Sequence, residues 1–221
     1  MNVVCDSSSI ISLGSTCVID ALRFMEEKAG TDFLIPPAVQ DEIVGHAFKV
    51  NKYRFSALRM KNLVREGVLD ITEPKGVVEE GKRILDLANS IYSVRGRSLP
   101  LIQAGEAECL ALFKFVEGSA LMVDEKTTRL LIEDPEGLRK TIRAEYKEAV
   151  ALNEKALSEF GKAVKGIKCI RSTELLWVAV ENGFFDRFDN DKEVALKAAL
   201  HCLRRAGCSI SHRELDEYES L

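Results

Sequence analysis

Short runs of apolar and β-branched residues alternate with longer amphipathic segments along most of the chain. The runs lack the strict alternation of a half-exposed strand, as expected for strands covered on both faces. Strands are predicted over Asn2–Cys5, Phe33–Ile35, Val68–Ile71, Ala120–Val123 and Ile167–Ile170. Helices are predicted over Cys17–Lys28, Ala38–Ala47, Phe55–Arg65, Val78–Val94, Ala104–Val116 and Lys126–Glu133. This alternation favours a three-layer α/β/α sandwich around a central parallel sheet of about five strands.

One apolar stripe does not fit a minimal five-stranded sandwich. The stripe repeats about every four residues through Leu138, Ile142, Tyr146, Val150, Leu157, Phe160 and Val164. Pro135 suits the first turn of a helix, and Gly166 follows the stripe. The pattern predicts one long helix over residues 135–165, inserted before the last strand. Its apolar face would pack on its own domain or form a surface for a dimer or a partner.

Further helices are predicted after the last strand, over Ser172–Glu181 and Lys192–Arg205. A short terminal helix follows, and Ser211 and Glu214 at its start fit a capping box. No linker, repeat or low-complexity tract divides the chain. We therefore expect one domain over residues 1–221, with a core at about 2–185, a helical insertion at 135–165 and a helical extension at 186–221.

Composition places the chain among ordinary globular proteins, with 46% hydrophobic and 30% charged residues. No apolar run approaches the ~18 residues that a membrane helix needs, and the amino terminus lacks the pattern of a secretory signal. A cytoplasmic protein is expected, with no membrane partner. The six cysteines form no C-x-x-C pair, which favours buried free thiols over disulfides or a zinc site.

Basic residues gather in one stretch of a chain whose net charge is −4. Between Ile43 and Arg65 there is no acid, and the cations are Lys49, Lys52, Arg54, Arg59, Lys61 and Arg65. Such a stretch suits a bound polyanion or forms a solvated helix face. Arg95 and Arg97 flank a glycine before a predicted helix, where they would contact phosphate or solvate a turn. The candidate nucleic-acid contacts are Lys52, Arg54, Arg59, Arg95 and Arg97.

Four acids stand where an open parallel sheet places its ligands. Asp6 and Asp124 directly follow two apolar strands, and the carboxyl ends of such strands line the binding crevice. Glu42 and Glu106 lie in the first turns of two predicted helices. Structural roles remain open for each, because Asp is a favoured N-cap and first-turn acids complement the helix dipole.

Together these motifs resemble the successive motifs of PIN domains. The resemblance covers most of residues 2–185 and rests on Asp6-Ser7-Ser8-Ser9, Pro36-Pro37-Ala38-Val39-Gln40-Asp41-Glu42, Gly105-Glu106-Ala107-Glu108, Val123-Asp124-Glu125 and the tail Gly166–Thr173. The chain departs from that pattern at two motifs. Glu106 replaces the Asp common in the family's toxins, with Glu108 nearby as an alternative. Glu125 stands where many relatives have a second aspartate.

The resemblance implies a metal-dependent nuclease, an endoribonuclease with Asp6, Glu42, Glu106 and Asp124 as catalytic acids and metal ligands. Converging carboxylates repel by roughly 4 kcal/mol per pair at ~4 Å and an effective dielectric near 20, so they need a cation or a proton. Oxygen ligands suit Mg²⁺ or Mn²⁺. The implied partners are RNA, a cognate antitoxin or another protein, and a second copy in a homodimer.

The alternative is a PIN-like module that has lost catalysis and binds RNA or a protein partner. Other α/β enzyme classes lack their motifs here. A dehalogenase-type phosphatase needs a second Asp at the position of Ser8. The chain also contains no phosphate-binding P-loop, no dinucleotide-binding G-x-G-x-x-G and no G-x-S-x-G nucleophile elbow.

Overall fold

A central parallel sheet organises the computed structural model, which describes residues 1–46 and 51–219, without the side chains of residues 46, 52 and 219. Its strands lie in the order β3-β2-β1-β6-β8, and each neighbouring pair is parallel. The strands are β1 (Asn2–Cys5), β2 (Asp32–Ile35), β3 (Leu69–Ile71), β6 (Ala120–Met122) and β8 (Cys169–Ile170). All five strands predicted from the apolar runs are present. The α/β class and the parallel sheet are confirmed.

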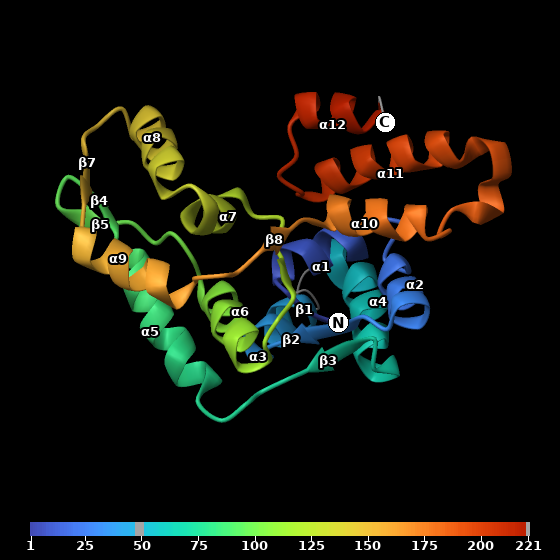
Figure 1. The fold of residues 1–221 in the computed structure, drawn as a ribbon, viewed down its shortest axis with the longest axis horizontal. Coiled ribbons are helices and arrows are strands. Elements are labelled where there is room, and N and C mark those ends of the chain that lie inside the picture. Colours follow the sequence, from blue (N-terminus) through green and yellow to red (C-terminus); the bar gives the residue numbers. More distant parts are fainter. Residues whose placement is uncertain (47–50, 220–221) are drawn as a thin grey trace.

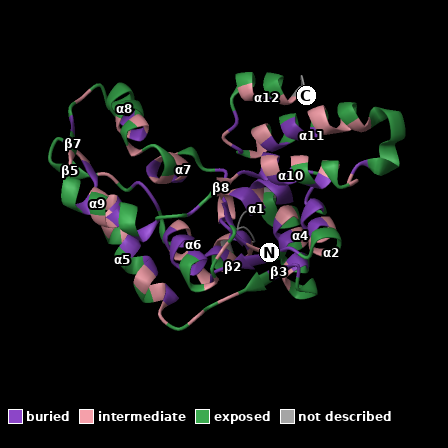
Figure 2. Cartoon of the chain, in the orientation of Figure 1, coloured by how far each residue is buried: buried purple, intermediate pink, exposed green. Residues whose placement is uncertain are grey.

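Helices flank this sheet, and its strands carry much of the buried core (Figures 1 and 2). The helices before and between these strands are α1 (Ser7–Gly14), α2 (Ala21–Ala29), α3 (Pro37–Gln40), the π-helix η1 (Asp41–His46), the 3-10 helix η3 (Asn51–Tyr53), α4 (Arg54–Glu66), α5 (Val77–Asn89), α6 (Ala104–Phe115) and α7 (Lys126–Glu133). Helix α1 packs against α4, α10 and α11, whereas α6 packs against α3 and α5. Helix α1 had no counterpart in the prediction, and Ala47 of the predicted second helix lies outside the described residues.

The predicted long helix over 135–165 is wrong. Helix α8 (Pro135–Tyr146) ends where Lys147 adopts a φ of 53°, strand β7 (Val150–Leu152) follows, and α9 (Glu154–Ala163) begins after Asn153, whose side chain caps it. The apolar stripe was misleading because Val150 belongs to a strand. The sequence signal for the break is Asn153, a favoured N-cap residue in the middle of the stripe.

The predicted helix over Val78–Val94 is too long for a related reason. Helix α5 ends at Asn89, and Tyr92–Val94 forms strand β4. This strand pairs antiparallel with β5 (Arg97–Ser98) and with β7, giving a second, three-stranded sheet. Val94 pairs with Val150. The two segments that were wrongly predicted as helix, β4 and β7, are therefore each other's strand partners. Local periodicity does not detect such long-range pairing.

The carboxyl-terminal part folds back beside the central sheet (Figure 1). It consists of α10 (Ser172–Glu181), the 3-10 helix η4 (Asp186–Asp191), α11 (Lys192–Ala206) and α12 (His212–Glu219). The predicted capping box opens α12, since Ser211 N donates to Glu214 Oε2 at 2.8 Å and Glu214 N donates to Ser211 Oγ at 3.2 Å. No helix in the described part of the chain is long and apolar enough to cross a membrane.

The six cysteines are free thiols. Cys5, Cys109 and Cys208 are buried and Cys169 is partly buried. The prediction of buried thiols is wrong for Cys17 and Cys202, which are exposed. Cys17 follows the end of α1 and Cys202 lies on α11, so both belong to the surface between these helices.

Candidate functional site

Asp6 ends β1 and begins α1. Its side chain is 2% exposed, and Oδ2 accepts hydrogen bonds from Ser8 N at 3.0 Å and from Ser8 Oγ at 2.6 Å. The other oxygen, Oδ1, is buried and has no hydrogen-bond partner among the described residues. A buried carboxylate oxygen without a partner is costly, and a ligand that supplies positive charge or a proton would relieve this cost.

Glu106 occupies the first turn of α6 and closes its capping box. Its Oε2 accepts from Gln103 N at 2.7 Å, and its Oε1 accepts from Thr128 Oγ1 of α7. Thr128 is buried. The two bonds fix the direction of the Glu106 carboxylate without adding positive charge.

Glu42 lies on η1 and reaches the amino-terminal turn of α6. A Cβ built on Gly105 would stand only 2.6 Å from Glu42 Oε1. The absence of a side chain at Gly105 therefore leaves the space in which the Glu42 carboxylate sits. Gly105 directly precedes Glu106, so the two glutamates meet at one turn of α6.

The electrostatics of Asp6 and Glu106 reflect this crowding. Burial, with the charge of Glu42 adding to it, raises the pKa of Asp6 to about 6 although Ser8 hydrogen bonds oppose the rise. Burial, followed by the charge of Asp6, raises the pKa of Glu106 to about 7. Both carboxyl groups thus hold protons more tightly than an ordinary acid does.

Asp124 follows β6, next to the strand that carries Asp6. The register pairs Cys5 with Met122, and Ser8 Oγ links the two strand ends by accepting from Asp124 N at 3.0 Å while donating to Asp6. Both oxygens of the Asp124 carboxylate are hydrogen-bonded: Oδ1 accepts from Ser172 N and Oδ2 from Ser172 Oγ, both at 2.7 Å. It therefore caps the amino terminus of α10.

A buried ion network holds the residue before Ser172. Arg171 is 7% exposed, and its guanidinium lies 2.6 Å from Glu174 and 2.7 Å from Glu214 of α12. Tyr218 donates to Glu174 at 2.9 Å, and Ser209 N donates to the Asp124 carbonyl at 3.1 Å. The carboxyl-terminal helix is thus tied to the segment that binds Asp124.

Glu108 and Glu125, which lie close in sequence to the motif acids Glu106 and Asp124, have hydrogen-bond partners of their own. Glu108 Oε2 accepts from Ala38 N of α3 at 3.2 Å, whereas Glu106 bonds Gln103 and Thr128. This separation agrees with the ~200° between residues two apart on a helix. Glu125 is exposed and caps α7 by accepting from Thr128 N at 2.9 Å.

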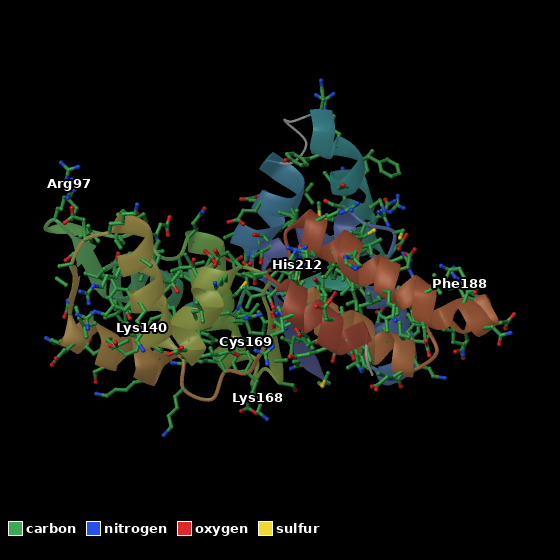
Figure 3. The ribbon with its side chains drawn as sticks, turned by 90° about the horizontal axis from the view of Figure 1, so that it is seen from above. Arg97, Lys140, Lys168, Cys169, Phe188 and His212 are labelled. Atoms are coloured by element: carbon green, nitrogen blue, oxygen red, sulfur yellow. The ribbon has the colours of Figure 1, made fainter. Side chains whose placement is uncertain are left out.

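The predicted nucleic-acid contacts are scattered over the molecule. Arg59 Nη1 donates to the carbonyls of Gly14 and Thr16, so this side chain caps the end of α1. Arg95 pairs with Glu148 at 2.5 Å, and Arg97 projects from the outer edge of the smaller sheet (Figure 3). Arg54 is exposed at the start of α4. Lys49 and the side chain of Lys52 lie outside the described residues.

The ligand atoms of these acids suit a divalent cation, but the acids as they lie are not close enough together to hold one. Asp6, Glu42 and Glu106 offer only oxygen atoms, which suit Mg²⁺ or Mn²⁺, and Asp6 Oδ1 is available. Within residues 1–46 and 51–219, no three acid, histidine or cysteine side chains stand close enough to hold an ion as they lie. Mutual repulsion keeps uncompensated carboxylates apart. The oxygen atoms of the three acids are of the type that the ion prefers. The side chains would have to move closer together to bind it.

Sequence reasoning overlooked four residues that arrange these acids: Ser8, Gly105, Thr128 and Ser172. Ser8 and Gly105 lie inside motifs that carry two of the acids, so the sequence held part of this signal. Asp6-x-Ser8 is the spacing of an N-cap with its first-turn donor. The bond between Asp124 and Ser172 joins residues 48 apart, and only the fold reveals it.

The fold and the acids at the carboxyl ends of β1 and β6 define an α/β protein with a carboxylate-lined site at the sheet edge. The sequence profile of the PIN domain family matches residues 2–136, which include all four acids. The match covers more than half of the chain, and the chain belongs to the PIN domain family. Members are generally nucleases and usually use divalent metal ions. Comparisons with curated proteins and with solved structures found no match.

Proposed function

We propose that this protein is a metal-dependent endoribonuclease that hydrolyses RNA phosphodiesters, with Mg²⁺ or Mn²⁺ held by Asp6, Glu42 and Glu106 and supported by Asp124. The observation that carries the proposal is the buried, unpartnered Oδ1 of Asp6 beside two further acids. An unpartnered buried oxygen costs stability, and carboxyl groups with strongly perturbed pKa values cluster at functional sites.

Each acid has a distinct part in the proposal. Asp6 and Glu106 would bind the cation in their ionised forms, and each must first lose a proton that burial helps it to keep. Glu42 would complete the set from η1. Asp124 keeps a role because each carboxylate oxygen has a second lone pair, so the bonds from Ser172 orient this side chain without exhausting it. A bound divalent cation would activate water and stabilise the charge that develops on the phosphate.

A second candidate function is a PIN-like module that binds RNA or a protein without cutting it. The engagement of both Asp124 oxygens by Ser172 and the present spacing of the acids favour this alternative. It requires that the carboxylates stay apart when a divalent cation is supplied.

The test is cleavage of a pool of structured RNAs by the purified protein with Mn²⁺, with Mg²⁺ and with EDTA. The nuclease proposal predicts products only with metal. Asp6→Asn should lower the rate by at least about 100-fold, since even outer-shell partners of a metal site contribute 10–100-fold. Asp70→Asn is the control, because Asp70 is exposed on β3. Intact RNA under all conditions would favour the non-catalytic module.

A further inference from the structure

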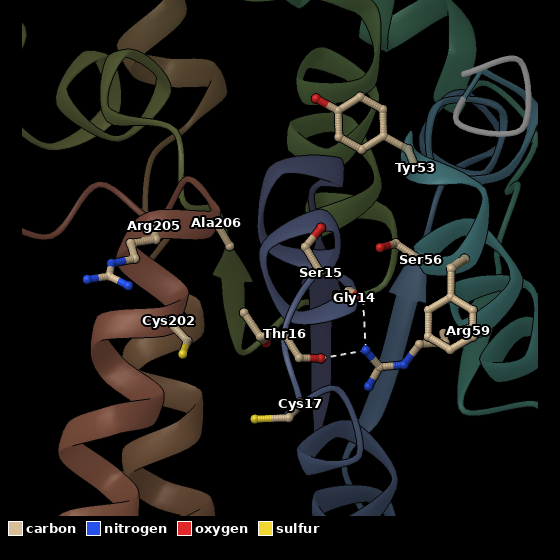
Figure 4. A pocket seen from close by; sticks show the side chains of 11 residues that line it. Gly14, Ser15, Thr16, Cys17, Tyr53, Ser56, Arg59, Cys202, Arg205 and Ala206 are labelled. Carbon is tan, nitrogen blue, oxygen red and sulfur yellow. Dashed lines mark hydrogen bonds between the residues drawn. The ribbon is translucent and has the colours of Figure 1, made fainter. Parts of the chain in front are cut away.

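A hollow of about 950 Å³ lies between the carboxyl-terminal turn of α1, the start of α4 and the end of α11. Figure 4 shows α1 between the other two helices, with Arg59 bonded to Gly14 and Thr16 at the base of one wall. The lining residues are Gly14, Ser15, Thr16, Cys17, Tyr53, Phe55, Ser56, Arg59, Cys202, Arg205 and Ala206. None of the functions proposed above uses this hollow.

Its chemistry differs from that of the molecule as a whole. The chain carries a net charge of −4, yet the lining contains two arginines and no acid. Two aromatic side chains stand at the start of α4, where Phe55 is 73% exposed and Tyr53 is 43% exposed. The hollow thus combines exposed aromatic rings with arginine side chains. This is the combination found where single-stranded nucleic acid stacks its bases and neutralises its phosphates.

The hollow also has a defined relation to the acids. Helix α1 begins beside Asp6 and ends at Gly14, which lines the hollow. Eight residues of helix span about 12 Å, so one helix separates the two features. Arg59 fixes the end of α1 through two carbonyl groups, which keeps this wall rigid and leaves Arg205 of α11 as the exposed cation.

We propose that this hollow binds a single-stranded segment of RNA, with a base stacked on Phe55 and a phosphate paired with Arg205. The inference rests on the proposed nuclease function for its choice of RNA, and it assigns the place where substrate beyond the cut linkage lies. Basic lining residues and exposed aromatic rings favour this occupant over an apolar protein segment, which would offer no anion to Arg205.

Binding can be separated from cleavage by working in EDTA. The fluorescence anisotropy of a labelled single-stranded RNA of about 12 nucleotides, within the range that one such surface covers, is titrated with the full chain. Phe55→Ala should weaken binding about tenfold, because loss of one stacked base has an effect of this size, and Phe55→Trp should restore it. Arg205→Ala should lower the slope of log affinity against log salt by about 0.7.

Matched controls lie elsewhere on the surface. Phe115→Ala removes another exposed ring, 46% exposed at the end of α6, and Arg213→Ala removes an exposed arginine of α12. Both should bind the RNA like the parent. Duplex RNA of equal length should be insensitive to Phe55→Ala, because its bases are already stacked. Melting curves of Phe55→Ala should match the parent, which excludes unfolding as the cause.

The outcomes distinguish this inference from the nuclease proposal. If the parent cuts RNA but Phe55→Ala and Arg205→Ala bind it unchanged, the hollow is not the binding place and the nuclease proposal stands. If these variants lose binding while the parent never cuts, the hollow is supported and the nuclease proposal fails. If the parent does not bind single-stranded RNA even at low salt, the hollow serves another class of partner and the inference is overturned.

Discussion

Asp6 and Asp124 end neighbouring strands of one sheet and are both buried, yet their carboxylates have opposite surroundings. Asp6 has one oxygen without a partner and two further acids nearby. Asp124 has both oxygens bonded to Ser172, next to an arginine that two glutamates hold. At the Asp6 corner (Asp6, Glu42 and Glu106) acids crowd together, whereas at the Asp124 corner (Asp124 and Ser172) hydrogen bonds hold the carboxylate. The comparison distinguishes Asp6, which has an oxygen available for a ligand, from Asp124, whose two oxygens are held by Ser172.

Substituting each aspartate by asparagine in EDTA should give stability changes of opposite sign. At pH 8, Asp6→Asn removes a desolvated charge and should raise the free energy of unfolding by roughly 1–3 kcal/mol. Asp124→Asn removes two charge-assisted bonds and should lower it by roughly 2–3 kcal/mol. Urea unfolding followed by circular dichroism measures both. Equal destabilisation by the two variants would remove the distinction between the corners.

The pH dependence of stability should report the Asp6 corner. The folded pKa values are about 6 for Asp6 and about 7 for Glu106, both above ordinary values near 4. Between about pH 4 and 7 the folded chain therefore holds protons that the unfolded chain has lost. Its free energy of unfolding should fall as pH rises through this window, by up to about 1.4 kcal/mol per pH unit for each group.

Saturating Mn²⁺ should remove this decline, because the ion stabilises the deprotonated carboxylates. In EDTA, the double variant Asp6→Asn and Glu106→Gln should lack the part of the decline in unfolding free energy that these two acids cause. Parallel pH profiles for the parent and this double variant would show that the two acids titrate normally.

Gly105→Ala tests the placement of Glu42. The added methyl group would stand 2.6 Å from Glu42 Oε1 and should push this flexible carboxylate aside. Mn²⁺ affinity should fall about tenfold, while alanine's better helix propensity keeps the unfolding free energy within about 1 kcal/mol. Gly161→Ala is the matched control, since a Cβ there meets nothing within 4 Å. Equal Mn²⁺ affinities of these variants and the parent would exclude Glu42 from the site.

Glu108→Gln should have the smallest effect. Glu108 bonds Ala38 N and not the Asp6 corner, so we expect a loss of about 1 kcal/mol in unfolding free energy from one charge-assisted bond and no change in Mn²⁺ affinity. Glu106→Gln, two residues away, should weaken Mn²⁺ binding clearly. A reversal of these two results would move the third acid of the site to Glu108.

The sequence was sufficient for the central sheet and for the ends of β1 and β6, because buried strands leave local apolar runs. It failed where an element depends on a distant partner. The apolar stripe through Val150 predicted a helix, but pairing with Val94 makes a strand there. Likewise, the sequence predicted Asp124 as a site acid but not its bonds to Ser172, and it did not reveal that Arg59 donates to the carbonyl groups at the end of α1. Such roles depend on contacts between segments far apart in the chain.

Calorimetric titration of the parent protein with Mn²⁺ at pH 8, beside Asp6→Asn, tests the central claim most directly. The account predicts saturable binding to the parent, its loss in Asp6→Asn, and normal binding in Asp70→Asn, because the buried Oδ1 of Asp6 is the available ligand atom. Absence of saturable binding to the parent, or binding that Asp6→Asn leaves unchanged, would contradict the assignment of this acid group as a metal site.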